Sequence, residues 1–169
     1  MLLTQMESAS TFKPEAVSPP KQVQQVQQVQ LKEKFASADV VILYRISSGG
    51  YPKTKPSYIT KEACFKNALN VAEEFSDANK GKNLFFQVIA DNCTAELWSL
   101  VEAELTSSAL EEAAVGSIRT PLGNGAASFR LALQIACQAC KPSAIVYMLE
   151  DDYVHETNRK SLERIFGGL

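Results

Sequence analysis

The chain has 169 residues and a formal charge of −2, from 17 Lys and Arg against 19 Asp and Glu, which suits one domain rather than two. Its 46% hydrophobic and 21% charged residues are typical of a globular protein and exclude a collagen-like fibre, a coiled coil and disorder throughout. A pI of about 5.5 shows no basic excess, so we expect no nucleic-acid partner.

The N-terminus begins with three apolar or sulfur-containing residues, Met1-Leu2-Leu3, and turns polar at Thr4. It therefore lacks the apolar centre of a secretory signal. No stretch of the chain reaches the ~18 to 20 apolar residues that a membrane-spanning helix requires. We expect a cytoplasmic protein that is not an integral membrane protein.

Residues 1–36 have a composition unlike the rest. They contain three prolines and a Gln-Val repeat over Gln22 to Gln30, which offers too little apolar surface for a core. We expect a disordered or weakly helical tail here, followed by one α/β domain over residues 37–169. The valines of the repeat lie three residues apart, so the tail is also a candidate contact for a protein partner.

The first half of the domain alternates apolar runs with a helical pattern. Val40 to Tyr44 is a continuous apolar run, which predicts a strand buried on both faces. A loop rich in Gly and Pro follows, and Thr60 offers an N-cap to the next helix. A second apolar run, 84–90, predicts the second strand. The helix between them carries an apolar stripe at three- and four-residue spacing: Cys64, Phe65, Ala68, Leu69, Ala72 and Phe75.

The second half repeats the alternation. A helix with Leu97 and Val101 on one face precedes a weaker strand over 113–118. An almost wholly apolar helix over 126–140 should be buried on most sides. A fourth strand over 143–149 and a short helix around Leu162 and Phe166 complete the pattern.

This order of elements predicts an α/β fold: a three-layer, Rossmann-like, mostly parallel sheet flanked by helices. Open sheets of this kind bind ligands beyond the carboxyl ends of their strands. Three polar segments follow the predicted strands and should meet at that edge: Arg45 with Ser47, Asp91 with Asn92, and Glu150-Asp151-Asp152.

The four cysteines, Cys64, Cys93, Cys137 and Cys140, are too few for a disulfide framework in a chain of this length. Cys137 and Cys140 have the spacing of a redox or zinc pair, but the chain has one histidine and no second such pair. We expect buried, structural thiols.

Three consecutive carboxylates after a buried strand repel one another unless cations or hydrogen-bond donors compensate. Mg²⁺ or Mn²⁺ suits such hard oxygen ligands. If the segment is extended, Glu150 and Asp152 point to the same side and form the metal-binding pair. The alternative is that the carboxylates cap the last helix, with no metal.

Leu149-Glu150-Asp151-Asp152-Tyr153, Val88 to Thr94, and Gly123-Asn124-Gly125 with Ser128 together resemble the nucleotide-sugar half of a GT-A glycosyltransferase related to family-2 enzymes. The resemblance covers residues 38–155, and the acidic motif after an apolar strand is its most specific part. It implies a nucleotide diphospho-sugar donor, an acceptor of unknown identity, and Mn²⁺ or Mg²⁺ as cofactor.

The resemblance also implies roles for individual residues. Asp152 would bind the metal, with Glu150 or Asp151 at the ribose or a metal-bound water. Asp91, Asn92, Arg45 and Ser47 would lie at the nucleoside or its phosphates. Gly123 and Gly125 would let the backbone approach the ligand, for which glycine is suited; an ordinary turn explains them equally well.

The chain departs from the family pattern in two places. Tyr44-Arg45-Ile46-Ser47 replaces the usual Pro-x-Asn after the first strand, and Glu150 replaces the first aspartate of the acidic motif. Arg45 suits either a phosphate contact or a surface salt bridge. His155, three residues past Asp152, is a candidate neighbour of the metal or of a leaving phosphate, or else a solvated surface residue.

In the resembling family the acceptor site and the general base follow the acidic motif, and little of this chain follows Asp152. We therefore expect part of a transferase, or one that a second subunit completes. The sequence leaves three hypotheses: a metal-dependent glycosyltransferase or its donor-binding half, a non-catalytic nucleotide- or partner-binding module, and a metal-dependent phosphohydrolase.

Overall fold

The computed structural model describes residues 32–49, 54–155 and 161–166. The Gln-Val repeat and the rest of residues 1–31 lie outside this part of the chain. Residues 32–37 are helical, and the Phe35 ring packs edge-on against Phe85 with 4.8 Å between ring centroids. The packed domain therefore includes residues 32–36, which the composition assigned to the tail, because Phe35 supplies an apolar anchor.

Four parallel strands form the sheet, in the order β3-β2-β1-β4. Their bounds are β1 Val40–Ser47, β2 Leu84–Asp91, β3 Val115–Thr120 and β4 Ile145–Glu150. This arrangement confirms the predicted parallel α/β fold. The first strand is longer than expected, because β2 pairs with it as far as Ser47 and β4 as far as Arg45. Arg45 and Ser47 thus lie in the strand rather than in the loop after it.

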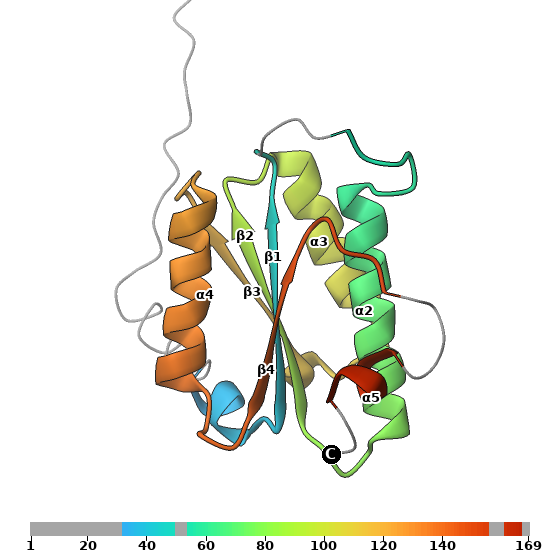
Figure 1. Ribbon diagram of the computed structural model, residues 1–169, viewed down its shortest axis with the longest axis vertical. Coiled ribbons are helices and arrows are strands. Elements are labelled where there is room, and N and C mark those ends of the chain that lie inside the picture. The colour runs from blue at the N-terminus through green and yellow to red at the C-terminus, as the bar shows by residue number, and fades with distance from the viewer. Residues whose placement is uncertain (1–31, 50–53, 156–160, 167–169) are drawn as a thin grey trace, which may run out of the picture.

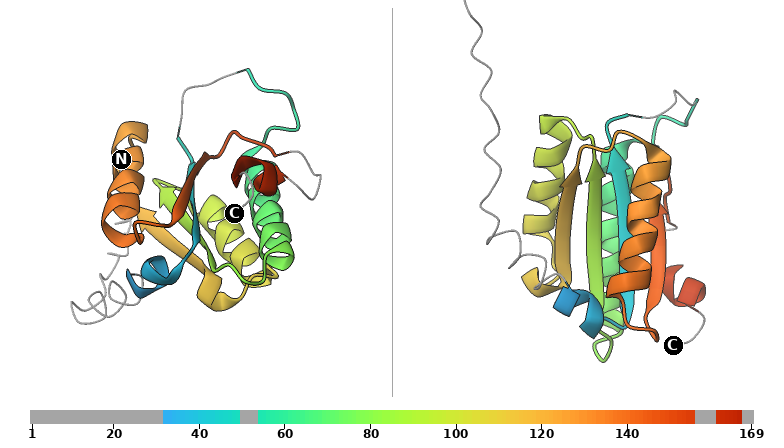
Figure 2. Two further views of the ribbon diagram at one scale, coloured as in Figure 1. Left: turned by 60° about the horizontal axis from the view of Figure 1, so that its bottom comes forward. Right: turned by 90° about the vertical axis from the view of Figure 1, so that its left-hand side faces the viewer.

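Helices cover both faces of the sheet, which gives the three predicted layers (Figures 1 and 2). One face carries α2 (Lys61–Ala78), α3 (Ala95–Ser107) and α5 (Ser161–Phe166), and the other carries α4 (Gly125–Ala139). A short 3₁₀ turn, η1 (Glu112–Ala114), precedes β3. The chain runs outward from β1 to β3 and then crosses back through α4 to place β4 on the other side of β1.

Helix α2 forms as its sequence predicts. The Thr60 side chain accepts a hydrogen bond from the Ala63 amide, and all six residues of the predicted apolar stripe are buried. The stripe packs against alternate residues of β1, among them Val40, Ile42 and Tyr44, which form the core on that face. The other residues of β1, Val41 and Leu43, belong to the core beneath α4.

The prediction that the helix over 126–140, which is α4 in the structure, is buried on most sides is wrong. Of α4, only Ser128 and Ala132 are buried, whereas Phe129 and Leu133 are 42% and 40% exposed. Within the described residues α4 covers its face of the sheet as the outermost layer, so its far side meets solvent. For the same reason Cys137 is exposed and Cys140 half-buried, while Cys64 and Cys93 are buried as expected.

The core predicts a clear stability effect at Phe65. This ring is fully buried in α2 and lies 5.3 Å from Tyr44 and 6.3 Å from Phe86, between centroids. We expect Phe65→Ala to lower the free energy of unfolding by about 3 to 5 kcal/mol, because it leaves a cavity. Urea unfolding measures this change. Tyr58→Ala is the control, since Tyr58 is 67% exposed and its loss should cost no more than about 0.5 kcal/mol.

Candidate functional site

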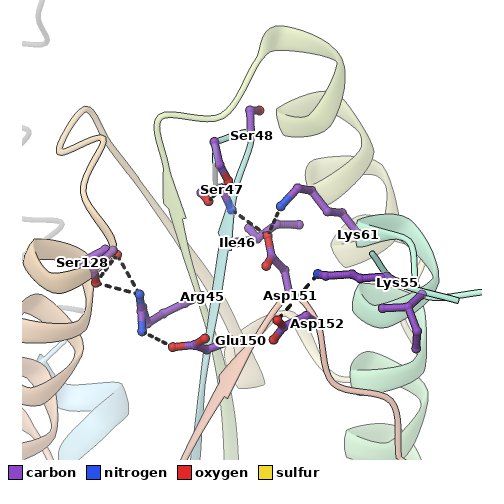
Figure 3. A pocket seen from close by; sticks show the side chains of 13 residues that line it. Arg45, Ile46, Ser47, Ser48, Lys55, Lys61, Ser128, Glu150, Asp151 and Asp152 are labelled. Carbon is purple, nitrogen blue, oxygen red and sulfur yellow. Dashed lines mark hydrogen bonds and ion pairs between the residues drawn. The ribbon is translucent and has the colours of Figure 1, made fainter. Parts of the chain in front are cut away.

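A pocket of about 470 Å³ opens at the carboxyl ends of β1 and β4. The chain leaves β1 toward α2 on one face and reaches β4 from α4 on the other, so this is the point where the winding of the sheet reverses. Ligands of open α/β sheets bind at such points. The lining residues are Arg45, Ile46, Ser47, Ser48, Gly49, Lys55, Ile59, Lys61, Gly125, Ser128, Glu150, Asp151 and Asp152 (Figure 3).

Arg45 ties together the elements around the pocket. Its Nη1 donates to Glu150 Oε1 at 2.7 Å, across the β1–β4 pairing. Its Nη2 donates to the Gly125 carbonyl at 2.8 Å and to Ser128 Oγ at 3.1 Å, both at the start of α4. The Arg45 side chain is only 12% exposed, so the guanidinium with its three hydrogen bonds is part of the pocket wall. Of the two roles open in the sequence, the structure shows the salt bridge.

The other two carboxylates of the acidic motif contact lysines. Asp151 Oδ2 accepts from the Ser47 amide at 3.1 Å and from Lys61 Nζ at 2.5 Å. Asp152 Oδ2 lies 3.6 Å from Lys55 Nζ. Lys61 is the first residue of α2, and Lys55 lies in the segment between β1 and α2. Sequence reasoning missed both lysines, although their place between a strand end and a capped helix was a usable signal.

The expectation that Glu150 and Asp152 point to the same side is wrong. That expectation needs an extended segment, but β4 ends at Glu150 and a turn follows, with the Tyr153 amide 3.4 Å from the Glu150 carbonyl. Glu150 therefore points toward Arg45, and Asp152 toward Lys55 (Figure 3).

The directions of the three carboxylates also determine whether the acidic motif can bind a metal ion. Glu150, Asp151 and Asp152 each contact a different basic side chain instead of turning their oxygens toward one point. Within the described ranges, no group of three or more His, Cys, Asp or Glu side chains is placed to hold a metal ion. In this arrangement the donor set does not fit Mn²⁺ or Mg²⁺, and basic side chains supply the compensating positive charge. Metal dependence stays a prediction.

Asp91, Asn92 and Gly123 lie beside the pocket rather than in its lining. Asp91 is 3% exposed, and its Oδ1 accepts from Thr120 Oγ1 at 3.1 Å and from the Gly123 amide at 2.8 Å. Asn92 and Gly123 both have positive φ, 48° and 59°, which glycine adopts readily. These residues hold the ends of β2 and β3 together. Arg45, Ser47, Gly125 and the acidic motif are the predicted residues that line the pocket.

A second hollow, of about 310 Å³, lies on the other side of the Arg45–Glu150 pair, along the outer edge of β4. Its lining is mainly apolar and aromatic: Phe129, Tyr147, Met148, Leu149 and Tyr153, together with Arg45 and Glu150. The Arg45 guanidinium lies over the Phe129 ring, 5.4 Å from its centroid. The ion pair thus separates a charged pocket from an apolar one.

The negative charges of the pocket act on the core beneath it. Tyr44 is fully buried between Phe65 and Phe86. Burial raises the pKa of its phenol far above the usual value, and the nearby Asp151 and Asp152 carboxylates raise it further. Tyr44 therefore stays neutral and acts as a packing residue.

His155 fastens the segment after the acidic motif to α2 and β4. Its backbone amide donates to Asn67 Oδ1 at 2.7 Å, and its carbonyl accepts from Asn67 Nδ2 at 3.1 Å. Its ring nitrogen Nε2 lies 3.1 Å from the Tyr147 hydroxyl. His155 is thus neither a solvated surface residue nor part of the pocket lining, and its contacts make it a structural residue.

Comparison of the chain with protein-family models, with curated proteins and with solved structures finds no match. The pocket and its residues are therefore the basis for a functional proposal.

The His155 contacts predict a pH dependence of stability. Partial burial lowers the pKa of His155 below its usual value of about 6.5, so the folded state disfavours the charged ring. Stability is then fully present above pH 6.5 and falls as the pH drops through 6.5 toward the folded pKa. We expect the midpoint of thermal unfolding to be lower at pH 5.5 than at pH 7.5.

The chain has a single histidine, so His155→Gln should flatten this dependence. Asp39 and Glu96, whose pKa values are lowered by hydrogen bonds, titrate below this window. An unchanged slope between pH 5.5 and 7.5 in the variant would show that His155 does not carry the effect.

Proposed function

We propose that this chain is the donor-binding part of a glycosyltransferase, which transfers a sugar from a nucleotide diphospho-sugar to an acceptor hydroxyl. The observation that carries the proposal is the charged pocket at the carboxyl ends of β1 and β4, where the winding of the sheet reverses. This is the position at which parallel α/β sheets bind nucleotides. The resemblance of residues 38–155 to the nucleotide-sugar half of GT-A enzymes narrows the ligand class.

The chemistry of the pocket suits a ligand with both phosphates and hydroxyl groups. Lys55 and Lys61 offer positive charge, and the N-terminus of α2 adds the positive end of its dipole. Glu150, Asp151 and Asp152 offer acceptors for sugar or ribose hydroxyls. A cavity of about 470 Å³ lies within the range of ligand sites, about 300 to 1,000 Å³.

The proposed roles follow the position of each side chain. Asp151 and Asp152, with Ser47 and Gly125, would contact the donor. Arg45 would fix Glu150 and the start of α4, which shapes the pocket wall. Asp91, Asn92 and Gly123 would position the neighbouring turn, since Asp91 is buried against Thr120 and Gly123.

A non-catalytic binding module is the second candidate, and the carboxylates of the pocket favour it. Deprotonating an acceptor hydroxyl requires a base that can approach that hydroxyl. Glu150, Asp151 and Asp152 each contact a basic side chain, and the resemblance places the general base after the acidic motif. A chain that binds the donor without turning it over would match this arrangement.

Thermal unfolding of the full chain with UDP, GDP, ADP, CMP and TDP, each with and without Mn²⁺, tests the proposal. A ligand at a hundred times its dissociation constant adds roughly 2.7 kcal/mol of stability, a shift of about 5 to 10 °C for this size. We expect such a shift with one nucleoside diphosphate. No shift with any nucleotide in either condition would contradict donor binding.

Two matched variants separate the pocket from the rest of the surface. If part of the shift requires Mn²⁺, Asp152→Asn should remove that part. Asp77→Asn should leave the whole shift unchanged, because Asp77 is 82% exposed and pairs with Lys80 outside the pocket lining. Release of phosphate from a nucleotide without any sugar acceptor would support the phosphohydrolase instead.

A further inference from the structure

The pocket holds balanced charges, which limits how it can accept a phosphate. Arg45 faces Glu150 at 2.7 Å, Lys61 faces Asp151 at 2.5 Å and Lys55 faces Asp152 at 3.6 Å. A diphosphate brings further negative charge next to these carboxylates, and like charges in close contact cost several kcal/mol. Favourable binding therefore requires a cation that can turn toward the phosphates.

Arg45 is poorly placed to turn. Its guanidinium donates to three groups, Glu150 Oε1, the Gly125 carbonyl and Ser128 Oγ, and its side chain is 12% exposed. Moving it toward a ligand would break contacts that join β1, β4 and α4. A guanidinium that donates to three protein acceptors in this way has a structural role.

Lys55 and Lys61 are less constrained than Arg45, because among the described residues each pairs with one carboxylate whereas Arg45 donates to three groups. Their side chains are 31% and 34% exposed on the pocket lining. The 3.6 Å from Lys55 Nζ to Asp152 is longer than an ordinary N–H···O hydrogen bond of about 2.7 to 3.2 Å. Each ammonium has three donors on a flexible stem, so Lys61 can keep Asp151 and still donate to a phosphate.

The placement of these lysines also favours an anion. Lys61 is the first residue of α2, directly after the Thr60 cap, where the positive end of the helix dipole attracts negative charge. Lys55 lines the same cavity from the preceding segment. Both cations thus face the position that phosphates occupy at the carboxyl edge of a parallel sheet.

We propose that Lys55 and Lys61 contact the ligand's diphosphate directly and supply the positive charge that the glycosyltransferase resemblance assigns to a divalent metal. The inference rests on the proposed function for the class of ligand. In the unliganded pocket Asp151 and Asp152 hold the two ammonium groups in place, and phosphate oxygens become additional or alternative partners when the ligand binds.

Titration calorimetry of the full chain in EDTA tests the inference, with inorganic pyrophosphate and with the nucleoside diphosphate that gives the largest thermal shift. We expect both to bind without a divalent metal. Lys55→Gln and Lys61→Gln should each weaken binding at least tenfold, and Lys61→Arg should retain most of it. Lys66→Gln is the matched control, because Lys66 lies on α2 and pairs with Glu62 and Glu104 outside the pocket lining.

Lys61→Gln removes a partner of Asp151, so circular dichroism and the thermal midpoint first establish that each variant is folded. Wild-type affinity in both Gln variants overturns the inference, and so does binding that requires Mn²⁺ or Mg²⁺; either result leaves the proposed ligand class intact. If no nucleoside diphosphate binds in any condition, the proposed function fails. Pyrophosphate binding then decides the inference alone. Pyrophosphate that binds the wild type but not the Gln variants would support the inference, and pyrophosphate that does not bind the wild type would overturn it.

Discussion

Strand β1 is hydrogen-bonded to β2 along one edge and to β4 along the other, and its residues alternate between two cores. Val40, Ile42 and Tyr44 pack under α2, while Val41 and Leu43 pack under α4. This double pairing continues to Arg45, which faces Glu150 in register. The pocket lies at the carboxyl ends of β1 and β4, where the strand order reverses: the chain leaves β1 toward α2 on one face of the sheet and reaches β4 from α4 on the other.

The sequence was sufficient to predict what depends on local pattern. Apolar runs gave the four strands, and three- and four-residue spacing gave the buried face of α2, because both reflect periods of the backbone itself. The exposure of α4 was not predictable in this way. The apolar sequence of α4 shows that the helix packs against the sheet. Whether a further layer covers Phe129 and Leu133 on its other side depends on the tertiary structure.

The charge pairs of the pocket also could not be predicted. Lys61 and Asp151 are 90 positions apart, and Arg45 and Glu150 are 105 apart. Their contact depends on sheet order, on the register of β4 and on the residue at which β4 ends. Alternation along an extended strand placed Glu150 with Asp152, but the turn at Asp151 redirects both aspartates toward lysines. Side chains alternate between the two faces of a sheet only as far as the hydrogen-bonded strand continues.

The two hollows share Arg45 and Glu150, so this ion pair is the wall between them. Its contacts with Gly125 and Ser128 fix the wall to α4, whereas Lys55 and Lys61 belong to the opposite side of the pocket. A ligand in the charged pocket can therefore recruit the lysines without disturbing the wall. If phosphates bind beside Lys55 and Lys61 as proposed, Arg45 lies between them and the apolar lining along β4, which includes Tyr147 and Tyr153. Its three hydrogen bonds would keep this lining unchanged when the lysines move.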